Sequence, residues 1–168
     1  VKRLELGAFT PIGTTDSEHA FCWMLGRLQD RYKSLPRPEA LDRAVADLAG
    51  ELHGLGVFNM LMSDSRTLYA HCGKRLCYIT RRAPFGIATL IDEDWRVDFA
   101  QETTERDVVS VVATQALTRD ETWTELSRGD TLVLRAGTGE VALRVETLER
   151  GAGFQFADEF HPELQFDR

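Results

Sequence analysis

Apolar residues in the first third of the chain recur every three or four positions, and this spacing predicts two helices. Thr15 can cap the first helix, because Glu18 stands three residues later, as in a capping box. Pro36 and Pro38 are expected to end this helix and to start the next one. The expected apolar stripes are Phe21, Leu25, Leu28 and Tyr32 in the first helix, and Leu41, Val45, Leu48, Leu52 and Leu55 in the second.

From residue 57 onward the pattern changes to short apolar or alternating runs, which predict β-strands. Segment 57–63 is nearly all apolar, so we expect a central strand that is buried on both faces. Segments 67–72 and 75–80 are expected to pair as a hairpin. Further strands are expected at 96–99, 107–114, 131–135 and 141–147, the last two paired with each other. Two helices followed by hairpin-linked strands predict an α+β fold with a mainly antiparallel sheet and both helices on one face.

The chain has 168 residues, which favours a single domain over 1–168. Its 27 acidic and 20 basic residues give a net charge of −7, and this balance argues against nucleic-acid binding, which needs clustered Lys and Arg. No apolar run approaches the ~20 residues of a transmembrane helix, and no secretory leader is visible at the start. We therefore expect neither a nucleic acid nor a membrane among the partners. The tail, 154–168, mixes phenylalanines with acidic residues and is expected to pack on the body.

Cysteine usage indicates a reducing compartment. Cys22, Cys72 and Cys77 are an odd number, so they do not form a disulfide framework, and we expect a cytoplasmic protein. In a hairpin that turns at Gly73 and Lys74, Cys72 and Cys77 would lie diagonally on one face at roughly 7–8 Å. That separation is too large for a disulfide without distortion.

The sequence indicates neither a metal site nor a cofactor site. None of the four histidines stands at metal-ligand spacing from another. The nearest approach to a metal cluster is His71 and Cys72 with Cys77, which lacks a fourth ligand. The glycines at 137–139 are not followed by the Lys-Ser/Thr pair of a phosphate-binding loop. We therefore expect no metal and no cofactor.

A few polar residues are candidates for a binding site. Asp16 lies in the first turn of the first helix, where it can contact a ligand or merely complement the helix dipole. Asn59 is the only Asn in the chain and lies within an apolar strand, where a buried amide bonded to backbone is the alternative to a ligand contact. Arg81 and Arg82 could bind an anion or could form a solvated strand end.

Four segments of the chain carry a family resemblance. They are PIGTTDSE at 11–18, VFNMLMSD at 57–64, ITRRAPFG at 79–86, and ATQALT with ETW at 113–123. Together, and in this order, they resemble the class II glutamine amidotransferases, in particular the stand-alone YafJ-like group. The resemblance runs from about residue 9 to about residue 147. Two small departures are Ser65, where the group usually has Gly, and Ala116, where it usually has Pro.

The resemblance implies the four-layer αββα sandwich of the N-terminal-nucleophile hydrolases. It also implies hydrolysis of the glutamine side-chain amide through a γ-glutamyl thioester on an N-terminal Cys, with an Asn-Gly pair as the oxyanion hole. Within this chain it assigns binding of the glutamine α-ammonium to Asp16. Thr15 is a further expected substrate-binding residue, and Asn59 is expected to support the site.

A third departure from the family is large. Position 1 is Val, no cysteine lies near it, and the chain contains no Asn-Gly pair. We therefore expect the chain to be the C-terminal two-thirds of such a domain, inactive by itself, with no catalytic residue of its own. A hydrolase of γ-glutamyl peptides or amides and a non-catalytic binding module are the alternatives. The expected partners are glutamine or another γ-glutamyl compound and an ammonia-accepting synthase.

Overall fold

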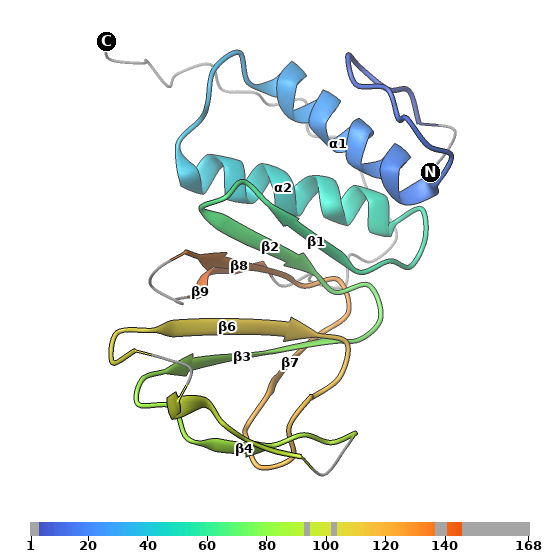
Figure 1. Cartoon of the computed structure of the whole chain (residues 1–168). Coiled ribbons are helices and arrows are strands. Elements are labelled where there is room, and N and C mark those ends of the chain that lie inside the picture. The colour runs from blue at the N-terminus through green and yellow to red at the C-terminus, as the bar shows by residue number, and fades with distance from the viewer. Residues whose placement is uncertain (1–3, 93–94, 102–103, 137–140, 146–168) are drawn as a thin grey trace.

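The computed structural model of the chain describes residues 4–92, 95–101, 104–136 and 141–145 (Figure 1). The helices are α1 (Asp16–Arg31) and α2 (Pro38–His53), with a short 3-10 helix at Phe99–Gln101. The strands are β1 (Met60–Ser63), β2 (Thr67–His71), β3 (Leu76–Arg82), β4 (Ile87–Thr89), β5 (Arg96–Asp98), β6 (Val108–Ala113), β7 (Thr124–Leu126), β8 (Thr131–Arg135) and β9 (Val141–Val145). The two short strands β4 and β7 were not expected from the sequence. The tail 154–168 lies outside the described residues, so its packing stays a prediction.

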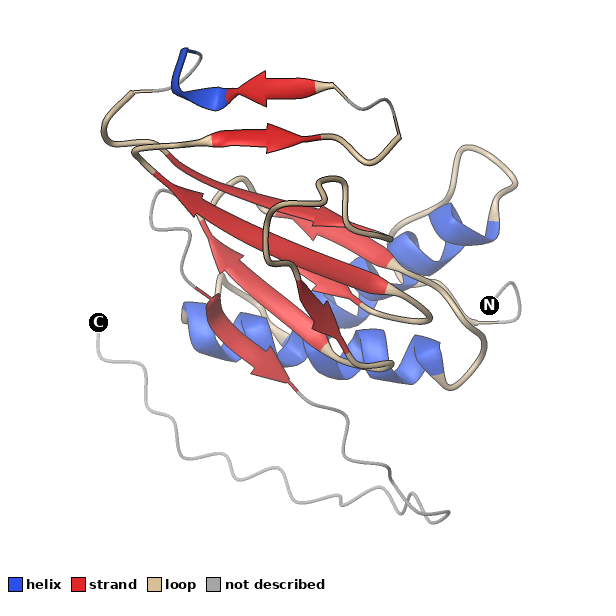
Figure 2. Cartoon of the chain, turned by 90° about the horizontal axis from the view of Figure 1, so that it is seen from below, coloured by secondary structure: helices blue, strands red, loops and turns tan. Residues whose placement is uncertain are grey.

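The described strands form three antiparallel sheets, with orders β1-β2-β8-β9, β6-β3-β7 and β4-β5. Both helices cover one face of the four-stranded sheet, and the three-stranded sheet lies on its other side (Figure 1). Seen from below, the strands lie in front of the helices, and the β4-β5 pair stands at one end of the layers (Figure 2). The α+β prediction is confirmed, and the helix–sheet–sheet layering corresponds to three layers of the αββα sandwich.

The start of α1 is held by two side chains. Thr15 is the N-cap as predicted, and its hydroxyl accepts the backbone N–H of Glu18 at 3.2 Å. The Glu18 carboxylate does not bond back to Thr15 as it would in a capping box. It accepts instead the N–H groups of Ile12 at 2.7 Å and Gly13 at 2.8 Å. Glu18 therefore fixes the loop that leads into the helix.

The main core lies between the helices and the four-stranded sheet. Its buried members are Trp23, Met24, Val45, Leu48, Leu52, Tyr69 and Val133. The apolar stripe expected for α1 is partly wrong, since Phe21 is 48% exposed while Trp23, outside the expected stripe, is buried. Phe21 does not fill the core, and instead lines a cavity beside the helix.

Segment 57–63 also differs from its prediction. Only its second half is a strand, and β1 is an edge strand of the described four-stranded sheet, not a central one. Val57 and Leu61 are 55% and 57% exposed, so the segment is not buried on both faces. The run is apolar because its residues line the same cavity as Phe21.

The hairpin expected between 67–72 and 75–80 does not form. Strand β2 pairs with β1 and β8, whereas β3 pairs with β6 and β7, so the chain crosses from one sheet to the other between them. Gly73 allows this crossing, because a Cβ atom there would overlap the backbone of Phe58. Cys72 and Cys77 consequently do not share a hairpin face, and both are buried free thiols.

A buried ion pair ties α2 to the four-stranded sheet. Asp42, which is 2% exposed, accepts a hydrogen bond from the Tyr69 hydroxyl at 3.0 Å and pairs with the guanidinium of Arg135. Arg135 also donates to Thr67 Oγ1 at 2.7 Å. Burial, together with the Asp42 carboxylate, raises the pKa of Tyr69 to about 12. The tyrosine therefore remains a hydroxyl and a donor throughout the ordinary pH range.

Candidate functional site

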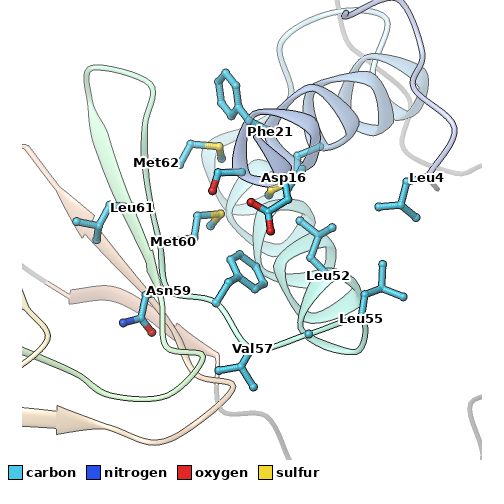
Figure 3. Close-up of a pocket in the computed structure, with 15 residues that line it drawn as sticks. Leu4, Asp16, Phe21, Leu52, Leu55, Val57, Asn59, Met60, Leu61 and Met62 are labelled. Carbon is cyan, nitrogen blue, oxygen red and sulfur yellow. The ribbon is translucent and has the colours of Figure 1, made fainter. Parts of the chain in front are cut away.

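A cavity of about 890 Å³ lies between the start of α1, the end of α2 and β1 (Figure 3). Its lining is mostly apolar and consists of Leu4, Asp16, Ser17, Ala20, Phe21, Met24, Leu52 and residues 55–62. The volume is within the ~300–1,000 Å³ of small-molecule sites, which are mostly apolar with a few polar groups that orient the ligand. The polar residues of this lining are Asp16, Ser17 and Asn59.

The Asp16 carboxylate points into this cavity, between Met60 and Leu52 in the view of Figure 3. Thr15 already caps the helix, and Glu18 already holds the preceding loop. No group among the described residues donates a hydrogen bond to the Asp16 carboxylate. Asp16 lies in the first turn of α1, as predicted, and its carboxylate is available to a ligand, so its role in substrate binding stays a prediction.

Thr15 and Asn59 are both engaged with backbone. The Thr15 hydroxyl serves the helix cap, so its role toward a substrate stays a prediction. Asn59 precedes β1 and is exposed, which corrects the expectation of a buried strand position. Its Nδ2 donates to the carbonyl of Arg75 at 2.9 Å, and its Oδ1 accepts the N–H groups of Gly73 at 3.0 Å and Lys74 at 3.3 Å. The amide points away from Asp16 in Figure 3, so it holds the cavity lining to the sheet crossing.

Two histidines meet beside the cavity, although neither lines it. Nδ1 of His53, the last residue of α2, lies 3.0 Å from Nε2 of His71, the last residue of β2. Arg128 Nε donates to His53 Nε2 at 3.2 Å, and Thr131 Oγ1 lies 2.9 Å from His71 Nδ1. No local sequence pattern predicts this pair, because the contact joins a helix end to a strand end 18 residues away.

Both histidines resist protonation. Burial lowers the pKa of His71 to about 4, the neighbouring His53 lowers it as well, and Asp130 opposes the shift. Burial and the charge of Arg128 also lower the pKa of His53. In the unfolded chain both rings titrate near ~6.5. Below that pH the unfolded state therefore binds more protons than the folded state, and stability falls with falling pH.

We expect the stability contributed by His71 to be complete above pH 6.5 and to be lost as the pH falls toward 4. The loss should reach about 3 kcal/mol for this ring, since each pKa unit corresponds to ~1.4 kcal/mol. Denaturant unfolding between pH 7 and pH 5 measures how steeply the free energy of unfolding falls with pH. Most carboxylates titrate below this pH range, so they contribute little to the slope. The variant His71→Gln should lose most of that slope, and an equal slope in both proteins would contradict the assignment.

Arg81 is not a free anion-binding group. Its guanidinium forms a two-pronged ion pair with Glu121, at 2.7 and 2.6 Å. Glu121 also accepts from the Thr118 hydroxyl at 2.6 Å, and Thr118 Oγ1 accepts the indole N–H of Trp123 at 3.0 Å. This network holds the 113–123 segment against β3, which gives these residues a structural role.

The described residues contain neither a metal-binding cluster nor a membrane-crossing helix. Among them, no three His, Cys, Asp or Glu side chains are grouped as a bound metal ion would require. None of the described helices combines the length and the apolar character of a membrane-crossing helix. The cavity at Asp16 therefore remains the candidate site.

Comparison with known proteins relates the chain to one family. The sequence profile described as "Glutamine amidotransferases class-II" matches residues 1–155. "Putative glutamine amidotransferase YafJ" of Escherichia coli (strain K12) is 52% identical over 130 residues, which cover 77% of this chain and 51% of that protein. A "Putative glutamine amidotransferase" of Haemophilus influenzae is 35% identical over 127 residues, which cover 76% of this chain and 43% of that protein. The chain thus spans about half the length of these curated relatives, or less.

A solved structure agrees with the sequence comparison. It is a crystal structure from Pseudomonas aeruginosa PA01, described as a "predicted glutamine amidotransferase", with a TM-score of 0.68 and 41% sequence identity to this chain. The match covers 83% of this chain and 57% of that one. Sequence and fold therefore point to the same family.

Proposed function

Because the chain belongs to the class II glutamine amidotransferase family, we propose that it forms the substrate-binding part of an enzyme that hydrolyses the side-chain amide of glutamine. One observation carries the proposal: the Asp16 carboxylate faces the cavity and has no donor among the described residues. A carboxylate in such a position suits a cation that donates hydrogen bonds. The α-ammonium of glutamine is such a cation.

In this proposal the covalent steps belong to residues upstream of this chain. An N-terminal Cys thiolate attacks the amide carbon, ammonia leaves, and water hydrolyses the γ-glutamyl thioester to glutamate. The N–H donors of an Asn-Gly segment stabilise the tetrahedral oxyanion. The chain matches only about half of the YafJ protein, so that relative has room for such a segment. We use "full-length protein" for this chain together with that proposed segment.

The size of the cavity favours a second substrate class. Pockets of ~300–1,000 Å³ hold drug-sized ligands. The cavity lies within this range, and free glutamine is smaller than such ligands. A γ-glutamyl peptide or amide would use the space, and the same nucleophile would then release an amine in place of ammonia. Product analysis with glutamine and with γ-glutamyl dipeptides separates the two substrates, and a non-catalytic binding module would release neither product.

The released ammonia implies a further partner. We propose that it passes to an ammonia-accepting synthase, which would be the protein partner of the full-length protein. All three cysteines of the chain are buried free thiols, which suits a reducing compartment, and we propose the cytoplasm.

Replacing Asp16 by Asn in the full-length protein is expected to lower kcat/KM for glutamine by about 10- to 150-fold. A hydrogen bond to a charged group contributes about 1.5–3 kcal/mol, and ~1.4 kcal/mol corresponds to a tenfold change. Asn keeps the size of the side chain and removes its charge. Steady-state kinetics and thermal melting on the same preparations measure the effect.

The control for Asp16→Asn is a substrate without the α-amino group. The wild type should turn this substrate over poorly, and the variant should lose little more. If Asp16 merely complements the helix dipole, the variant loses under about 1 kcal/mol of stability and keeps its kcat/KM for glutamine. That combination would refute the proposed binding of the α-ammonium by Asp16.

A further inference from the structure

The connector that joins α2 to β1, residues 54–59, forms one wall of the cavity. Residues 55–59 of this connector are part of the lining. Among the described residues, backbone hydrogen bonds hold only its first turn, where the N–H of Gly56 bonds to the carbonyl of His53 at 3.3 Å. The rest of the wall therefore depends on side-chain contacts for its position.

The hydrogen bonds around His53 fix where the protons of the neutral histidine pair lie. Arg128 Nε can only donate, so His53 Nε2 accepts and carries no proton. His53 then carries its proton on Nδ1 and donates it to His71 Nε2. His71 in turn carries its proton on Nδ1 and donates it to Thr131 Oγ1. The three hydrogen bonds therefore all run in the same direction, from the exposed Arg128 through the two histidines to the buried Thr131.

The middle and the end of the wall rest on the same part of the sheet. The ring of Phe58 stacks on His71, with ring centroids 5.4 Å apart and planes at 28°. The Phe58 backbone lies directly over Gly73. The Asn59 amide then binds Gly73 and Arg75. His71 therefore contacts both His53, the residue just before the wall, and Phe58 within the wall.

We propose that His53 and His71 are positioning residues for the ligand of the cavity, and that their mutual hydrogen bond clamps the 54–59 wall in place. Neither ring lines the cavity, and His71 is fully buried, so the pair acts through the wall and not by touching the ligand. The identity of the ligand rests on the proposed function, whereas the clamp rests on contacts among described residues alone.

Charged and titratable groups face the pair from more than one element. Arg128, on the turn before β8, faces His53, and its charge opposes protonation of that ring. Asp130, at the end of the same turn, favours protonation of His71, and Cys72 follows His71 along the chain. A proton on His53 Nε2 displaces only the exposed Arg128, but a proton on His71 Nε2 breaks the pair. The clamp is therefore expected to hold at neutral pH and to open in acid.

A matched pair of variants in the full-length protein tests the clamp. Asn and Leu have the same shape, but only Asn can donate a hydrogen bond from the position of His53 Nδ1. In His53→Leu we expect amide hydrogen exchange of residues 54–56, whose N–H groups are hydrogen-bonded, to become about two- to tenfold faster, the factor that one lost hydrogen bond predicts. The KM for glutamine should rise by a similar factor with kcat nearly unchanged. In His53→Asn both quantities should return close to the wild-type values.

Nitrogen NMR of the histidine rings in the wild type at pH 7 should show both protons on Nδ1. A ring proton on Nε2 of either residue, or equal exchange rates in the Asn and Leu variants, would overturn the clamp. Faster exchange in His53→Leu with an unchanged KM would overturn the positioning role. A wild type that does not turn over glutamine would instead refute the proposed function, while the exchange and NMR results would still decide the clamp.

Discussion

The 168-residue chain alone is expected to release no ammonia from glutamine above background, whereas the full-length protein should release it. The expected difference is several orders of magnitude, as is typical when a nucleophile is lost. The chain has Val at position 1 and no Asn-Gly pair. Its own cysteines are poor substitutes, because all three are buried and burial raises the pKa of Cys72 and Cys77. A thiol that is buried and protonated is a weak nucleophile.

A coupled ammonia assay on both proteins, at equal concentration and pH, makes this comparison. Replacing Cys22, Cys72 and Cys77 by Ser or Ala, one at a time, is the control and should leave the turnover per folded molecule of the full-length protein unchanged. Comparable turnover by the short chain and the full-length protein would contradict the account. It would direct attention to these three cysteines as nucleophiles.

Replacing Asp42 by Ala is expected to lower the free energy of unfolding by about 3 kcal/mol. Removing one partner of a buried ion pair typically costs ~3–5 kcal/mol, because the other charge is left uncompensated. The lower end applies here, since the Arg135 side chain keeps 25% of its surface exposed and can be partly hydrated. The Tyr69 hydroxyl also loses its acceptor. Denaturant unfolding at neutral pH measures the loss.

The matched control lies on the same helix. Asp47 pairs with Arg31 at 3.7 Å, and both side chains are about half exposed, at 55% and 48%. Exposed pairs of this kind contribute only ~0–1 kcal/mol, so Asp47→Ala should change stability by less than about 0.5 kcal/mol. Equal losses in the two variants would show that the Asp42 pair does not tie α2 to the sheet.

The elements that the sequence predicted correctly are those that local patterns determine. The helices follow from apolar spacing with the Thr15 cap and Pro38, and the β8-β9 pair follows from two apolar runs separated by a short glycine-containing sequence. At Gly73 the pattern predicts a hairpin turn where the chain crosses between sheets, since a glycine between two strands suits either structure. Only the close approach of Phe58, a residue distant in sequence, decides between them.

In the candidate site, too, local patterns predict some features, whereas others depend on contacts between residues distant in sequence. The place of Asp16 in the first turn of α1 could be predicted from the helix-start motif, and the resemblance added its role. For the apolar wall the pattern wrongly predicts a buried strand, because residues that line a cavity and residues that fill a core are equally apolar. The His53–His71 pair could not be predicted, since it depends on how α2 lies against β2. Tertiary packing, not local pattern, brings those two rings together.

The central claim is that Asp16 binds the α-ammonium of the substrate, and a crystal structure of the full-length protein with bound glutamine tests it most directly. A variant without the nucleophile would keep the substrate intact during the experiment. The account predicts glutamine in the cavity beside α1, with its ammonium nitrogen about 2.7–2.9 Å from a carboxylate oxygen of Asp16. Glutamine bound with its ammonium on other groups, while the Asp16 carboxylate contacts only the backbone at the start of α1, would contradict it.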